Sequence, residues 1–344
     1  MRSFNAAANY AVGIAFGLGC TNKIELHKHV YRNVRNNFGI PADMAVRVTA
    51  QAVEALKRDK SIRPVFRELA SIPYSYGKNY SFKGIDRVSL QVTPAGRQIM
   101  AFVCGDYQKQ HLNKKRGQAD LIYRDGMFFL QVSVDFPDAD TIQVSDFIGV
   151  DLGIVEIATT DDGQSFSGKP IEKSRRRNNR ARKTYQRRNS RSARRRLRRM
   201  ARRQSRFQAD INHCISKKIV AKALAQSKGI AVEDLSGIRG RCEKTAGKKQ
   251  RGRLSNWGFS QLRRHLSYKA KLAGVPLVAV DARYTSQDCS RCGHRDKANR
   301  KSQSEFVCKA CGNALNADHN GALNIRSRAL GASVNSPDSA SAPA

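Results

Sequence analysis

The chain has 344 residues, of which 40% are hydrophobic. This length and composition suit two or three folded domains and exclude a wholly disordered protein. The 63 Lys and Arg residues outnumber the 28 Asp and Glu residues, so the formal net charge is +35. An excess this large is typical of proteins that bind a polyanion, most simply nucleic acid.

The N-terminal segment Met1–Cys20 imitates a secretory signal peptide and even ends in Gly-Cys. Export does not suit a strongly basic chain whose later cysteines have the spacing of metal ligands, and the apolar run is too short to span a bilayer. We therefore expect a cytoplasmic protein, nucleoid-associated in a prokaryote, with no membrane partner.

Residues 1–70 are predicted to form a helical module. Apolar residues recur at near-helical spacing at Val30, Val34 and Phe38 and, after Pro41, at Met44, Val48, Val53 and Leu56. Such a module can grip a nucleic-acid duplex or simply pack against its neighbours, and the sequence leaves both alternatives open.

Residues 71–146 change to strand-like patterns. Short apolar runs are separated by turn signals such as Arg124-Asp125-Gly126, which is typical of antiparallel hairpins. We expect a small β-barrel, a wedge-like domain that carries the helical module. Tyr76 and Tyr80 lie in a tract that also contains lysines. These tyrosines either stack on nucleobases or pack along an edge of the barrel.

Residues 147–151 read as a buried strand that ends in an aspartate, Asp151. Burying a carboxylate in an apolar strand is costly unless it is paired or ligates a metal. Asp151 is therefore the first candidate for a functional acid. A hairpin follows, turning at Asp161-Asp162-Gly163.

The segment Arg175–Arg206 contains sixteen arginines and no acid, Gly or Pro. Its composition predicts a helix that continues to about Gln226, in which a bound polyanion offsets the repulsion between like charges. Arginine favours bidentate phosphate contacts and stacking on bases. A disordered basic linker is the alternative. The candidate nucleic-acid contacts here are Arg175, Arg176, Arg177, Arg187, Arg188, Arg195 and Arg199.

A short buried strand follows the break at Lys228-Gly229 and ends in Glu233-Asp234. Because successive side chains of a strand point to opposite faces, only one of these two acids can share a site with Asp151. The alternation does not say which. A helix over residues 257–273 and a strand that contains Asp281 come next.

Two Cys-x-x-Cys pairs, Cys289/Cys292 and Cys308/Cys311, are separated by fifteen residues. This spacing predicts a zinc ribbon, in which four thiolates bind one structural Zn²⁺. A glycine follows the second cysteine of each pair, where the knuckle turns. Two structural disulfides or four unrelated thiols are the alternative, but the chain has no secretory context.

Asp318 lies seven residues after Cys311, at the start of a predicted helix. The elements follow the order of an RNase H-like α/β fold: strand, hairpin, long helix, strand, helix, strand and last helix. In that fold, acids on the first strand, at the end of the next crossover strand and on the last helix converge. Three such carboxylates can hold two Mg²⁺ ions for phosphodiester hydrolysis.

Four stretches carry a family resemblance, namely GVDLGI (149–154), AVEDLSGI (231–238), RYTSQDCSRCGH (283–294) and NADHNGALNI (316–325). They resemble the RuvC-type nuclease of TnpB proteins, the RNA-guided endonucleases of insertion sequences and ancestors of type V CRISPR effectors. The resemblance covers about residues 4–330. It assigns Asp151, Glu233 and Asp318 as the catalytic and Mg²⁺-binding acids and the four ribbon cysteines as the Zn²⁺ ligands. It leaves Asp234 and Asp281 outside the triad.

The resemblance also implies an enzyme that binds a guide RNA from its own element and cleaves guide-matched double-stranded DNA. The barrel and helical module would read a short duplex motif beside the target. No obligatory protein partner is expected. One alternative is a guided regulator that binds without cutting, although all three acids are present. The other alternative is an unguided RuvC-like transposase or nuclease. Such a protein would not need the helical module and barrel that we predict in the front half of the chain.

The predicted domains are a helical recognition module (1–70), a β-barrel wedge (71–146), the first part of a RuvC nuclease domain (147–285, with the Arg-rich helix 175–206), a zinc ribbon (286–313), the last nuclease helix (314–330) and a disordered tail (331–344). TnpB proteins usually begin with a further barrel strand, which does not precede Met1 in this sequence. No separate second nuclease domain is recognised, so one site would cut both strands in turn.

Overall fold

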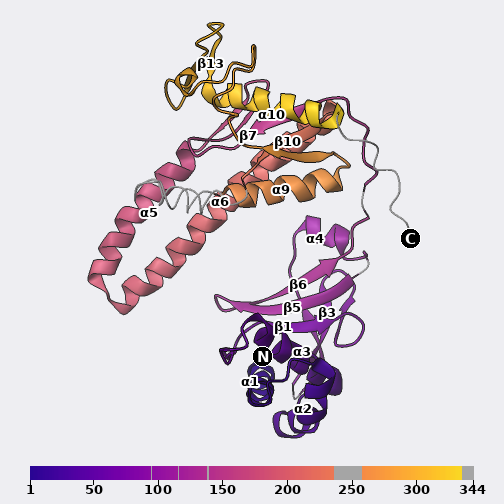
Figure 1. Cartoon of the computed structure of the whole chain (residues 1–344). Coiled ribbons are helices and arrows are strands. Elements are labelled where there is room, and N and C mark those ends of the chain that lie inside the picture. Colours follow the sequence, from indigo (N-terminus) through magenta and orange to yellow (C-terminus); the bar gives the residue numbers. More distant parts are fainter. Residues whose placement is uncertain (94, 115, 138, 236–257, 335–344) are drawn as a thin grey trace. The chain divides into compact units, whose positions relative to one another are not determined.

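The computed structural model describes residues 1–93, 95–114, 116–137, 139–235 and 258–334. The chain divides into two compact units, Met1–Phe136 and Pro137–Ala344. Each unit has its own hydrophobic core, and Figure 1 traces the elements of both.

The first unit begins with three helices, α1 (Arg2–Gly17), α2 (Lys23–Phe38) and α3 (Ala42–Arg58). The side chain of Asn22 caps α2 by accepting two backbone N–H groups, and Gly39 ends the helix at a φ of 63°. The segment that imitates a signal peptide forms α1, and its Phe4 and Val12 are buried in the core of this unit.

The strands of the first unit form two antiparallel sheets. The elements are β1 (Ile72–Ser75), β2 (Tyr80–Lys83), β3 (Arg87–Val92), β4 (Gly96–Ala101), α4 (Asp106–His111), β5 (Arg116–Arg124) and β6 (Met127–Val134). The sheet orders are β1-β5-β6 and β2-β3-β4. Asp125 and Gly126 both have positive φ and close the β5–β6 hairpin.

The predicted barrel is not observed. A barrel needs an unbroken ladder of strand pairs around the whole sheet. Within the described part of this unit, the only β-bridge that joins the two sheets is the isolated one between Tyr76 and Tyr80. The alternating pattern predicted the strands, but it carries no signal for closure of the sheet.

The second unit is built on a mixed five-stranded sheet in the order β11-β10-β7-β8-β9. Its strands are β7 (Phe147–Asp151), β8 (Glu156–Thr160), β9 (Ser165–Ser167), β10 (Gly229–Asp234) and β11 (Leu277–Asp281). β7, β10 and β11 are parallel to one another, whereas β8 and β9 continue from β7 as antiparallel hairpins.

The remaining elements of this unit are α5 (Lys169–Arg188), α6 (Arg191–Ala225), α9 (Phe259–Leu272), the 3₁₀ turn η1 (Lys297–Asn299), β12 (Glu305–Val307), β13 (Ala314–Asn316) and α10 (Ala317–Val334). Helices cover both faces of the sheet. Ile148 and Val150 of β7 pack in one cluster with residues of α6 and α9. Phe147 packs in another cluster with Ile325 and Ala329 of α10. The sheet therefore separates α6 and α9 from α10, as Figure 1 shows.

The Arg-rich segment differs from the single long helix that we predicted. It folds as two helices, α5 and α6, which run back along each other away from the sheet (Figure 1). Asn189 ends α5 in the left-handed region at a φ of 45°, and Ser190 caps α6 by accepting the N–H of Ala193. Local capping at these two residues divides the helix.

The last helix extends beyond its predicted end at residue 330 and reaches Val334. The rest of the predicted disordered tail, residues 335–344, lies outside the described residues. Among the helices that the structure describes, none is both long and apolar enough to cross a bilayer.

Candidate active site and metal centre

The three acids singled out in the sequence come from three elements of the second unit. Asp151 ends β7, Glu233 lies near the end of β10, and Asp318 is the second residue of α10. Glu233 and Asp318 are each 8% exposed. Burial, and after it the negative charges of both, raise the pKa of Asp151, so the three carboxylates lie close enough to interact.

The register of the sheet explains why Glu233, and not Asp234, faces Asp151. Val232 pairs with Val150 in the parallel ladder. The next residues along the two strands, Glu233 and Asp151, therefore lie side by side. Alternation puts both on the face that α10 covers. Asp234 instead accepts a hydrogen bond from Arg263 of α9, at 2.8 Å on the opposite face.

Asp318 does not cap its own helix. The side chain of Asn316 accepts the backbone N–H groups of Asp318 (2.9 Å) and His319 (3.2 Å) and so fills the capping role. The Asp318 carboxylate instead accepts a hydrogen bond from Arg300 at 3.3 Å. A helix-start aspartate would ordinarily be a cap, and Asn316 leaves this one available for another function.

Two glycines allow α10 to approach β7 closely. A Cβ added to Gly149 would lie 2.0 Å from the carbonyl oxygen of Ala322, a backbone atom that cannot move aside cheaply. A Cβ on Gly321 would lie 3.5 Å from Oδ2 of Asp151. The Asp151 carboxylate therefore lies directly against the first turns of the helix that carries Asp318.

Burial dominates the electrostatics of the three acids. Burial is the largest cause that raises the pKa of each above its usual range, and the pKa of Asp151 lies well above it. The positive charge of Arg300 lowers all three pKa values and opposes this effect. Such a cluster gains free energy when a cation binds to it.

Two residues of this site were not predicted from the sequence. Arg300 lies between the two cysteine pairs, and Thr285 precedes the first pair. The Thr285 hydroxyl is buried and donates to Oε1 of Glu233 at 2.5 Å. Thr285 is part of the RYTSQDCSRCGH stretch, but no spacing rule marks a threonine as the partner of a carboxylate 52 residues away.

The four ribbon cysteines form a compact cluster. Their sulfur atoms all lie within 4.8 Å of one another, with 3.7 Å between Cys289 and Cys311 and 3.6 Å between Cys292 and Cys308. A tetrahedron with Zn–S bonds of 2.3 Å has edges of about 3.8 Å. Disulfide sulfurs would be about 2 Å apart, so the donor set fits Zn²⁺.

The knuckle turns follow the sequence prediction. Gly293 and Gly312 have φ values of 75° and 70°, and each donates its N–H to the carbonyl of the first cysteine of its pair. Across the described ranges, these cysteines are the only group of three or more potential ligands with all donor atoms within 4.8 Å. The three carboxylates are spaced more widely than the four sulfurs.

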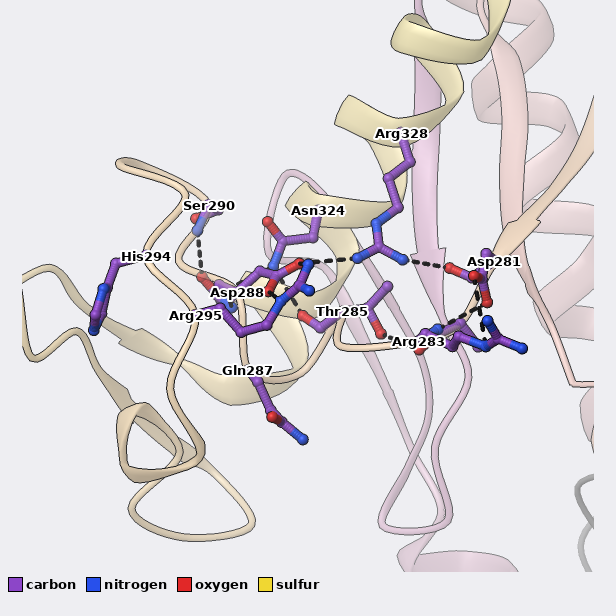
Figure 2. A network of polar contacts seen from close by, with 12 residues as sticks. Asp281, Arg283, Thr285, Gln287, Asp288, Ser290, His294, Arg295, Asn324 and Arg328 are labelled. Carbon is purple, nitrogen blue, oxygen red and sulfur yellow. Dashed lines mark hydrogen bonds and ion pairs between the residues drawn. The ribbon is translucent and has the colours of Figure 1, made fainter. Parts of the chain in front are cut away.

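A polar network joins the first knuckle to α10 (Figure 2). Asn324 donates to the carbonyls of Thr285 (2.8 Å) and Asp288 (2.7 Å), and Arg328 donates to Oδ2 of Asp288 (2.9 Å). Asp288 directly precedes the zinc-ligand position Cys289. The ribbon and the helix that carries Asp318 are therefore held together through side chains.

The predicted nucleic-acid contacts differ in exposure. Arg175 and Arg176 form ion pairs with Glu172 at 2.7 and 2.8 Å. Arg177, Arg187, Arg188, Arg195 and Arg199 are exposed, and no ion pair involves them within the described segments. Tyr80 is fully buried and donates to the Gly117 carbonyl, which accords with the packing alternative, whereas Tyr76 is 40% exposed.

Two regions of the chain, which lie almost wholly in the second unit, match known families. Residues 130–237 match OrfB_IS605, described as a probable transposase, and residues 259–325 match the Cas12f1-like TNB domain. The CRISPR-associated endodeoxyribonuclease Cas12f1 of Sulfoacidibacillus thermotolerans is 30% identical over 259 residues, which cover 69% of this chain and 58% of that protein.

The putative RNA-guided DNA endonuclease InsQ of Escherichia coli K12 is 29% identical over 220 residues, 58% of this chain and 53% of that protein. The chain thus spans between half and three fifths of the length of these two relatives. A cryo-EM structure of a Cas12f1–sgRNA–target DNA complex has the same fold, with a TM-score of 0.65 and 15% identity over 94% of this chain and 81% of that one. On these similarities and the four-cysteine cluster, the chain belongs to the TnpB/OrfB_IS605 family and carries a Cas12f1-like TNB domain.

Proposed function

We propose that this protein is an RNA-guided, Mg²⁺-dependent DNA endonuclease. It binds a guide RNA from its own element, recognises a short motif beside the target and hydrolyses guide-matched DNA. The observation that carries the proposal is the meeting of Asp151, Glu233 and Asp318 on the α10 face of the sheet. The names of the relatives support it, because Cas12f1 is an endodeoxyribonuclease and InsQ a putative RNA-guided DNA endonuclease.

Asp151, Glu233 and Asp318 would hold the Mg²⁺, because carboxylate oxygens are the ligands that this ion prefers. Their raised pKa values mark a buried cluster whose negative charge Arg300 offsets only in part. When bound, Mg²⁺ supplies the water activation and charge stabilisation that phosphodiester hydrolysis requires. The chain's own residues orient the acids: Thr285 holds Glu233, and Arg300 holds Asp318.

The hydroxyl of Thr285 gives the first test of this arrangement. Thr285→Val removes the donor to Glu233 and keeps the side-chain volume, so we expect Mg²⁺ to bind about 10- to 100-fold more weakly. Isothermal titration of the purified protein with Mg²⁺ measures this. Thr285→Ser keeps the hydroxyl and is expected to bind close to wild type. Equal affinities in the valine and serine variants would contradict the role of Thr285.

The α5–α6 hairpin is proposed to bind nucleic acid. Its exposed arginines greatly outnumber its acids: Glu172 is the only acidic residue of α5 and pairs with Arg175 and Arg176, and α6 contains a single acid, Asp210. A groove of about 610 Å³ lies between the two helices and is lined by both apolar and basic side chains, including Tyr185, Phe207 and Arg196. Such a mixed surface suits phosphates and stacked bases.

Replacing Arg187 and Arg188 by Gln is expected to weaken RNA binding and to make it less dependent on salt. Each lost phosphate contact lowers the slope of log K against log [salt] by about 0.7–0.9. Filter binding over a range of salt concentrations measures the slope. Arg175→Gln with Arg176→Gln removes the same charge from already paired positions, so a smaller change is expected. Equal effects of the two double variants would contradict the proposed contacts.

Guide RNA is the partner that separates the proposal from an unguided nuclease. The relatives include a Cas12f1 whose structure is a complex with sgRNA and target DNA. The test is to express the protein with its native flanking DNA and to sequence the RNA that copurifies. One discrete RNA that ends in a segment from outside the element supports guiding. Only heterogeneous cellular RNA would mean that the charge of +35 binds polyanions without selection.

A further inference from the structure

Tyr284 has an unusual backbone conformation for its residue type. Its φ is 64°, in the left-handed region. The other described non-glycine residues with positive φ are Asp125, Asn189 and Ser227, which are small and polar. A bulky side chain in this region is strained, and such strain persists only where the surroundings impose it.

The surroundings of Tyr284 impose this conformation from two sides. Its carbonyl accepts the N–H groups of Gln287 (2.8 Å) and Asp288 (2.9 Å). The next residue, Thr285, is held by Asn324 of α10 through its carbonyl (Figure 2). Its hydroxyl contacts Glu233 of β10. The backbone at Tyr284 is thus tied to the elements that carry two of the three acids.

The ring of Tyr284 is held from one side and is open to solvent. The guanidinium carbon of Arg295 lies 4.2 Å from the ring centroid. Arg295 is itself fixed by two hydrogen bonds to Asp288, at 2.5 and 3.1 Å, and Asp288 is fixed by Arg328 of α10. Tyr284 nevertheless remains 47% exposed. The adjacent Arg283 side chain is 82% exposed, pairs with Asp281 at 3.9 Å and adds a second cation.

We propose that Tyr284 and Arg295 form a stacking subsite for one nucleobase of the DNA strand that enters the Asp151–Glu233–Asp318 site. This inference rests on the proposed function. An exposed aromatic ring with a cation against it binds the face of any base, and a nearby arginine neutralises phosphate. The strained backbone at Tyr284 holds the ring on the residue that directly precedes Thr285, whose hydroxyl orients Glu233. The subsite would set which phosphate lies over the three acids.

The test combines a substrate change with variants of Tyr284. Guide-matched DNA is prepared with a single abasic nucleotide at successive positions around the scissile phosphate. With wild-type protein, we expect one position to lower kcat/KM by about 5- to 150-fold, the range for loss of one stacked base. Tyr284→Phe keeps the ring and should retain this position-specific loss.

Tyr284→Leu and Tyr284→Gly should lower kcat/KM on intact DNA by the same factor. In these two variants, the abasic nucleotide at that position should cause no further decrease in kcat/KM. Glycine also relieves the positive φ, so its Tm should be at least that of the leucine variant, which separates loss of the ring from misfolding. The subsite is overturned if the wild-type protein cleaves intact DNA but no abasic position lowers its kcat/KM. It is also overturned if the position-specific loss of kcat/KM persists in both the leucine and the glycine variant. A wild-type protein that cleaves no guide-matched DNA overturns the proposed function itself.

Discussion

Asp151→Asn is expected to lower the rate of cleavage of guide-matched DNA by at least about 10³-fold and to leave target binding unchanged. Asparagine has nearly the same shape but no charge, so the site loses a ligand for a divalent cation and keeps its packing against Gly321. Removal of a group central to the chemistry has effects of this size or larger. Single-turnover cleavage and equilibrium binding of the same target measure the two quantities.

The same variant is expected to be more stable than wild type when no divalent cation is present. Burial and the neighbouring acids raise the pKa of Asp151 well above its usual range. The folded protein then binds more protons than the unfolded chain, so the free energy of unfolding falls as the pH rises between the unfolded and folded pKa values. Asparagine avoids this loss, and we expect a gain of about 0.5–2 kcal/mol, the range that single stabilising substitutions commonly reach.

The gain should be present at neutral pH and absent below about pH 4, where the unfolded carboxyl is also protonated. Thermal unfolding in chelator at both pH values measures it. Asp234→Asn is the matched control, because Asp234 lies on the opposite face and pairs with Arg263. This control should retain cleavage. Cleavage retained by Asp151→Asn, or lost equally in Asp234→Asn, would contradict the assignment.

Cys289→Ser is expected to unfold the ribbon. The ribbon's own apolar core contains few buried residues, including Phe306 and Ala317, so the metal supplies most of its stability. Structural zinc contributes about 10–16 kcal/mol in small zinc folds. Because the preceding residue, Asp288, contacts Arg328 of α10, the damage should reach the helix that carries Asp318. The amount of bound zinc, the Tm of thermal unfolding and the rate of cleavage should all decrease.

Elemental analysis should give one zinc per wild-type chain and none in the variant. Cys214→Ser is the control, since this thiol is exposed and is not one of the four clustered cysteines. It should retain zinc, stability and cleavage. A Cys289→Ser protein that is metal-free, folded and fully active would rule out a structural role for the metal.

The parts of the site that depend on local spacing could be predicted from the sequence. The four cysteines were recognised from their intervals, and the structure confirms that they cluster. The family was recognised from short stretches around Asp151, Glu233 and Asp318, and the comparisons confirm it. The catalytic role of these acids stays a prediction, although the register of β7 and β10 brings the first two side by side.

The parts that depend on tertiary contacts could not be predicted. Thr285 and Arg300 reach acids far away in the sequence, and no periodic pattern encodes such pairs. Strand propensity indicated the elements of the first unit but not whether their sheet closes. In the Arg-rich segment, Asn189 and Ser190 are good capping residues, but the strong helix-forming composition around them concealed the break.

The most direct test of the central claim is to exchange the target-matching segment of the guide RNA. The purified protein is loaded with either of two guides that differ only in that segment and is given one plasmid that contains both matching sequences, each beside the same flanking motif. We expect Mg²⁺-dependent cleavage at the sequence that matches the loaded guide, and none with Asp151→Asn. Cleavage at the same place with both guides, or without RNA, would contradict an RNA-guided endonuclease.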